Sequence, residues 1–178
     1  IGGFKGVTDR LIIAPLLGFA ILGNYMLAMQ VYVVLMIFST VVFKYLLPQD
    51  STGIPNTKLK NYTIFISIGI AVLGITLAPL IISQLFPQYE DAIIAVQILS
   101  ISVVPATIGY IYVSEFLGLE KSRYVLIGRI TALSTLVLGM IILPTYFGIV
   151  GAACAFVLSS CTQTSFLILS KKKLGAKG

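Results

Sequence analysis

Among the charged residues within long apolar stretches or close to their ends, four are of types that could serve transport: Asp9, Arg10, Glu115 and Arg129. A charged side chain near the centre of a membrane helix costs about 2.5–3.5 kcal/mol on insertion scales, so such residues often line a cavity or an ion pathway. A carboxylate in that setting could couple the movement of a cation, and an arginine could bind an anionic phosphate through paired hydrogen bonds. We therefore take these four residues as candidates for the lining of a transport cavity.

Each candidate also has an interpretation that involves no transport chemistry. Asp9 and Arg10 could lie at the cytoplasmic interface of a short helix. Glu115 could be an interfacial carboxylate that pairs with a cation of the turn at 118–123, or with Arg129 on the next helix. Arg129 could instead extend along the helix to the cytoplasmic surface, because long basic side chains keep their charged ends in water.

Enzymatic chemistry finds little support in the sequence. The chain has no histidine, which excludes a Ser–His–Asp arrangement and an HExxH zinc motif, and it lacks a GxxxxGK[ST] phosphate loop. Cys154 and Cys161 lie two helical turns apart in an apolar stretch without other metal-binding residues nearby. The sequence therefore predicts neither an enzyme nor a bound metal or cofactor.

The composition places the chain in a lipid bilayer. Of its 178 residues 58% are hydrophobic and only 10% are charged, whereas a soluble domain carries about 25% charged residues. The net charge of +6 comes from basic residues that lie between apolar stretches. In that position basic residues typically set the orientation of a membrane protein, so we do not interpret them as a nucleic-acid binding surface. We expect an all-α, multi-pass bundle of transmembrane helices with no nucleic-acid partner.

A membrane helix needs about 20 mostly apolar residues, and the sequence predicts about six helices that form a single domain over residues 1–178. We expect the first to be cut short by a missing N-terminus and to end in a tight break at Gly23 and Asn24. The predicted spans are the partial 11–22 and the full 25–47, 62–86, 92–117, 124–146 and 152–169.

Three prolines also lie inside apolar stretches: Pro15, Pro79 and Pro105. Proline removes a backbone donor and kinks a helix, and neighbouring helices or water must satisfy the freed carbonyl. We expect a kink at each position. Such kinks would suit a protein that changes shape around a cavity, and they would equally serve packing alone.

The charges between the spans fall on one side of the predicted bundle. That side receives the loops 48–61 and 118–123 and the basic tail 170–178, while the turns on the other side hold no lysine or arginine but do hold Glu90 and Asp91. Positive charge marks the cytoplasmic side of a membrane protein. We expect a protein of the cytoplasmic membrane with a cytoplasmic C-terminus and with both loops inside.

Four short motifs follow one another along the chain: TDRLII (8–13) with LGNY (22–25), LFPQYEDA (85–92), GLEKS (118–122) and LPTYFGIVGAA (143–153). The last of them, at the junction between the last two helices, is the longest. In this order the motifs resemble those of the polysaccharide biosynthesis and export flippases, which share a superfamily with MATE drug exporters and lipid II flippases.

The resemblance implies a fold and a function. The chain would be the C-terminal half of a two-lobe, MATE-like transporter, and its partners would be the missing N-terminal lobe, the bilayer and an isoprenoid-linked glycan. The two lobes would flip this lipid-linked oligosaccharide across the membrane by alternating access. Asp9 matches an aspartate of the family and would face the cavity, where Arg10 could act with it on the pyrophosphate. Glu115 and Arg129 have no such match.

Two other functions remain open. A cation-coupled multidrug antiporter of the same superfamily would need deeply buried carboxylates, for which only Asp9 and Glu115 qualify. A membrane scaffold that transports nothing, such as an assembly partner for glycosyltransferases, would need no charged cavity at all.

Overall fold

The computed structural model describes residues 19–52 and 56–175, and every regular element in these ranges is helical. The all-α prediction is confirmed for this part of the chain. The elements are α2 (Phe19–Leu35), α3 (Ile37–Ser51), α4 (Thr57–Leu85), the 3-10 turn η1 (Pro87–Tyr89), α5 (Ala92–Gly118) and α6 (Ser122–Gly175).

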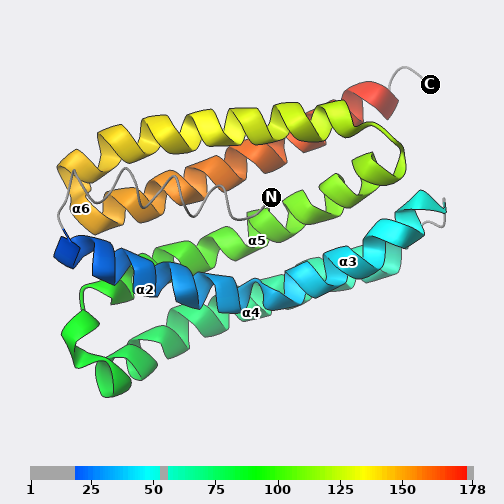
Figure 1. Ribbon diagram of the computed structural model, residues 1–178. Helices are drawn as coiled ribbons and strands as arrows, with labels where there is room; N and C mark the ends of the chain where they lie inside the picture. Colours follow the sequence, from blue (N-terminus) through cyan, green and yellow to red (C-terminus); the bar gives the residue numbers. More distant parts are fainter. Residues whose placement is uncertain (1–18, 53–55, 176–178) are drawn as a thin grey trace.

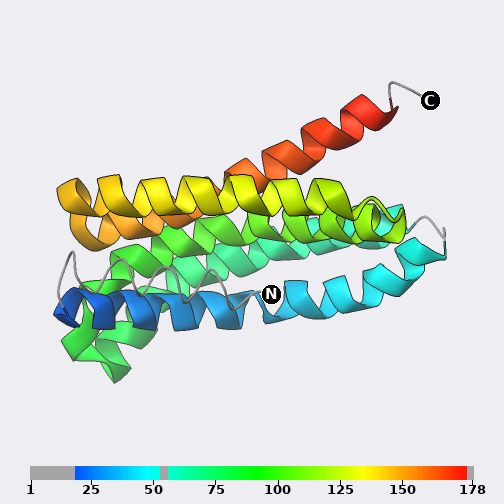
Figure 2. The ribbon, with the colours of Figure 1, turned by 45° about the horizontal axis from the view of Figure 1, so that its top comes forward.

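The helices form an elongated bundle with α5 at its centre (Figures 1 and 2). Helix α5 packs against α2, α3, α4 and α6. Half of the most apolar stretch of α5 is buried, against 22% for α4. Helix α4 therefore lies at the periphery, and its large exposed apolar side chains, such as Phe65 and Leu77, suit a lipid surrounding.

Three helices are long and apolar enough to cross a membrane, and the bent pair α2–α3 makes four if it counts as one span. Several such helices suggest a multi-pass membrane protein. Helix α6 also turns back on itself at Gly148, whose φ of 54° and ψ of −132° are not helical (Figure 1). The two arms lie side by side, since the Ser159 hydroxyl donates to the Ala132 carbonyl over 2.7 Å. These arms correspond to the predicted fifth and sixth spans.

The predicted break at Gly23 and Asn24 is wrong, because α2 runs through both residues. Packing explains the difference: Tyr25 and Ala28 are 1% and 0% exposed, and tertiary contacts override the weak helix preference of glycine and asparagine. The end of the predicted span 11–22 is therefore misplaced; its first residues, 11–18, lie outside the described residues.

The actual interruption lies within the predicted span 25–47, at Met36, where α2 and α3 meet at 44°. Neither glycine nor proline marks this position. The Thr40 hydroxyl donates to the Met36 carbonyl over 2.9 Å, and such a bond from a side chain to the preceding turn often bends a helix.

The predicted cytoplasmic loop 48–61 is shorter than expected. Helix α3 continues through Pro48 to Ser51, and α4 begins at Thr57. Pro48 has no N–H to donate within the last turn of α3, but its carbonyl accepts a bond of 2.7 Å from the Ser51 hydroxyl. Much of the predicted basic tail 170–178 is likewise helical, since α6 extends to Gly175.

Pro79 and Pro105 lie inside α4 and α5. Both helices continue through them, so the kinks predicted there stay predictions, and Pro15 lies outside the described residues. The helix ends at Ser51, Thr57, Gly118 and Ser122 gather with the C-terminal end of α6 at one end of the bundle (Figure 1). We call this the basic end, because it holds the lysines that flank these helix ends.

The reversal at Gly148 predicts a backbone effect that can be separated from packing. An added Cβ would meet no atom within 4 Å at Gly148 or at Gly69. Only Gly148 has a positive φ, so Gly148→Ala should lower the free energy of unfolding by about 1–3 kcal/mol. Gly69→Ala, inside a regular helix, should leave it unchanged or raise it. Thermal unfolding in detergent measures both, and equal stabilities would contradict the assignment of the turn.

Candidate functional site

An ion-pair network at the basic end is built around Lys60, near the start of α4. Its ammonium lies 2.8 Å from an oxygen of Asp50 and 2.9 Å from an oxygen of Glu115. The second oxygen of Glu115 lies 2.6 Å from the ammonium of Lys171. Two carboxylates and two lysines therefore balance one another across α3, α4, α5 and α6.

Asp50 reaches the network because α3 and α5 come very close at their ends. A Cβ at Gly118 would lie 2.6 Å from the backbone carbon of Asp50, so only glycine permits this approach. The Ser114 hydroxyl, on α5, donates to the second carboxylate oxygen of Asp50 over 2.6 Å. Both oxygens of the aspartate thus have partners from other helices.

The exposure of the side chains in the network increases from Asp50 to Lys171. The side chains of Asp50, Lys60 and Glu115 are 7%, 13% and 19% exposed, whereas Lys171 is 54% exposed. Lys171 also lies over the ring of Tyr112, 5.1 Å from its centre, a distance at which a cation is attracted to an aromatic face. The first three residues form a desolvated core, and Lys171 closes it toward the surface.

In this network the lysines neutralise the two carboxylates. Charged groups in a low-dielectric setting are tolerated when each has a partner, and here every carboxylate oxygen of Asp50 and Glu115 has one. Within the described ranges no cluster of acidic residues and cysteines could hold a metal ion. The network fixes four helix ends relative to one another.

A second polar contact lies deeper in the bundle, near Pro105. The Thr107 hydroxyl donates to the Val103 carbonyl over 2.7 Å, so the 2.6 Å contact between Ser39 and Thr107 uses the hydrogen of Ser39. The Thr164 hydroxyl, on α6, donates to the Pro105 carbonyl over 2.6 Å. These buried hydroxyls connect α3, α5 and α6 without any charge.

The predicted site residues fall into three groups. Asp9 and Arg10 lie outside the described residues. Glu115 belongs to the network, but its partners are Lys60 and Lys171. Pairing with Arg129 or with a cation of the 118–123 turn is wrong, because the ends of α4 and α6 bring other lysines to both carboxylate oxygens. Arg129 is half-buried on α6 and makes no ion pair with any described residue.

Asp50 and Lys60 were not among the predicted site residues. Pro48 predicts a loop from that position onward, and the sequence therefore places Asp50 in the loop and not against the helices. The sequence did hold one signal: Asp50 and Lys60 have opposite charges and lie ten residues apart, on either side of the turn between two apolar helices. This spacing allows an ion pair between them, but it does not indicate that Glu115 of α5 joins the same network.

Comparison of the chain with known protein families, with curated proteins and with solved structures finds no match. The structure itself defines the class: an all-helical protein whose several long apolar helices suggest multiple membrane passes.

The central place of Lys60 predicts unequal effects of two lysine substitutions. Lys60→Met leaves two nearly buried carboxylates short of a partner and should lower the free energy of unfolding by about 3 kcal/mol. Lys171→Met removes a half-exposed partner and should cost about 1 kcal/mol or less. Thermal unfolding of the purified protein in one detergent compares them. Equal losses would show that Lys60 is no more important than a surface lysine.

Proposed function

We propose that this chain is one lobe of a transporter that flips a lipid-linked oligosaccharide across the cytoplasmic membrane. The motifs at 8–13, 85–92, 118–122 and 143–153 support the flippase family. The long apolar helices supply the membrane-spanning framework that such a lobe requires. A second lobe, N-terminal to this one, would complete the cavity.

The observation that carries the proposal is the bent span α2–α3 and its contact with α5. The 44° bend at Met36 lies close to Ser39, which bonds to Thr107 only two residues beyond Pro105. Transporters place interrupted helices beside their substrate sites, near the middle of the membrane, where polar groups gather. A scaffold that only holds partners has no need of such an irregular, polar contact inside its bundle.

The charges of Asp50 and Glu115 favour flipping over cation-coupled drug export. A coupling carboxylate must bind and release a cation from the cavity. Both residues already bind lysine, and Asp50 also accepts a bond from Ser114. Neither is available without breaking the network, so this lobe offers the antiporter few carboxylates among its described residues.

Orientation follows from the distribution of charge. The loops and helix ends at the basic end carry the lysines, and the opposite end carries Glu90 and Asp91. Under the positive-inside rule the basic end and the C-terminus face the cytoplasm. The glycan would therefore be loaded at the basic end and released at the other.

Asp9 and Arg10 are the proposed contacts for the pyrophosphate. In liposomes that contain the full protein and a fluorescent lipid-linked oligosaccharide, Arg10→Gln should slow flipping at least about tenfold, since charge-assisted hydrogen bonds contribute about 1.5–3 kcal/mol. Asp9→Asn should also slow it. Lys58→Gln removes one exposed cation at the basic end and should leave the rate unchanged.

The outcomes separate the candidate functions. Full flipping by folded Asp9→Asn and Arg10→Gln proteins would disprove the cavity assignment. Dye efflux driven by a proton or sodium gradient, without glycan flipping, would establish the antiporter. A wild-type protein that moves neither substrate would support the scaffold.

The bend at Met36 can be tested by removing one hydroxyl. Thr40→Val deletes the side-chain bond to the Met36 carbonyl with little change in volume, so it should straighten the span and slow flipping several-fold. Thr76→Val is the matched control, because Thr76 makes the equivalent bond of 3.0 Å to Val72 within the uninterrupted helix α4. Equal flipping rates for both variants would show that the bend has no role in transport.

A further inference from the structure

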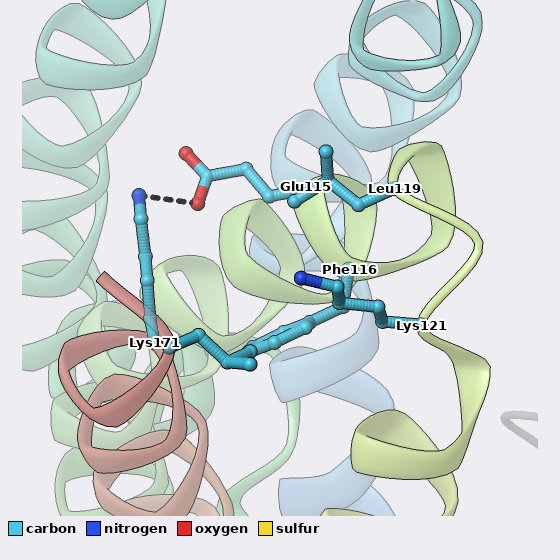
Figure 3. A pocket seen from close by; sticks show the side chains of 6 residues that line it. Glu115, Phe116, Leu119, Lys121 and Lys171 are labelled. Carbon is cyan, nitrogen blue, oxygen red and sulfur yellow. Dashed lines mark hydrogen bonds and ion pairs between the residues drawn. The ribbon is translucent and has the colours of Figure 1, made fainter. Parts of the chain in front are cut away.

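A pocket of about 320 Å³ lies between α5 and α6 at the basic end, beside the ion-pair network. Figure 3 shows its lining residues, which come from the end of α5, the following turn and the end of α6. They are Glu115, Phe116, Leu119, Lys121, Lys171 and Leu174.

The charges around this pocket leave a net attraction for an anion. Its carboxylate, Glu115, is already bound by Lys60 and Lys171. Lys121 has no ion pair with any residue that the structure describes, and its side chain turns back from the loop toward Phe116 (Figure 3). Exposed Lys172 follows directly on α6 and Arg123 lies close after Lys121, so the basic residues of this region outnumber Glu120, the acid that precedes Lys121.

The rest of the lining is apolar. Leu119 is 62% exposed and forms an apolar rim that a free inorganic anion would not use, while Phe116, only 2% exposed, closes the bottom of the pocket. Leu174 completes this surface from α6. The pocket also lies where the apolar helices α5 and α6 end, which is the depth of lipid headgroups if these helices span the bilayer.

We propose that this pocket binds an anionic membrane phospholipid, with its phosphate at Lys121 and the upper part of one acyl chain on Leu119 and Leu174. Basic pockets between membrane helices on the cytoplasmic side are known to hold anionic headgroups. The lipid would bridge α5 and α6 beside the network and would shield Lys171. This site needs no glycan and stands apart from the transport cavity.

The test measures lipid retention by the full protein in detergent, using native mass spectrometry without any glycan present. The probes are phosphatidylglycerol and phosphatidylcholine with identical acyl chains. One surface lysine contributes enough to change affinity for an anionic lipid about fivefold. Lys121→Gln should therefore bind phosphatidylglycerol about fivefold more weakly than wild type and should bind phosphatidylcholine equally well.

Lys58→Gln supplies the control, since it removes the same charge from the same end of the bundle but does not line the pocket. It should retain phosphatidylglycerol as the wild type does. Equal losses in the two variants would mean that lipids respond only to net charge, and no loss in either would mean that Lys121 holds no headgroup. Displacement of phosphatidylglycerol by millimolar inorganic phosphate would overturn the lipid assignment in favour of a simple anion site. Because Lys121 is exposed, its substitution should leave the fold intact, which size-exclusion chromatography verifies.

Discussion

The bridging of two carboxylates by Lys60 is the interaction on which the arrangement of the helices depends most. Apolar helices in lipid gain little from burying one another, so their relative positions are set by close packing and by directional bonds. Lys60 joins Asp50 and Glu115 within hydrogen-bond distance, and Lys171 adds the end of α6. These bonds of 2.6–2.9 Å join the ends of α3, α4, α5 and α6. The network therefore limits how far the four helix ends can move apart.

Small residues perform the same task along the length of the bundle. A Cβ at Gly74 would lie 2.5 Å from the Ser100 hydroxyl, and one at Gly139 would lie 2.9 Å from Ala155. Such contacts let helix backbones approach closely and gain dispersion energy where lipid offers no hydrophobic driving force. They add close packing along the bundle to the ion pairs at its basic end.

The sequence predicted those features that depend on composition and local chemistry. Long charge-free stretches predicted most helices, and the gap between the predicted spans 124–146 and 152–169 contains the reversal at Gly148. Features that depend on tertiary contacts were missed. Asn24 stays helical because its neighbours are buried, and the bend at Met36 lies in an apolar stretch where neither glycine nor proline marks it. For Glu115 the partner was wrong, since only the assembled bundle decides which lysine reaches it.

Polar contacts hold both halves of the bent span against α5. Helix α3 bonds to α5 at its start through Ser39 and Thr107 and at its end through Asp50 and Ser114. Helix α2, on the other side of the bend, bonds to α5 through the buried Tyr32 and Ser102. Because breaking a buried hydrogen bond leaves an unsatisfied polar group, neither half can leave α5 without a cost in free energy. In the proposed transporter, the bent span and α5 would therefore move together as one unit.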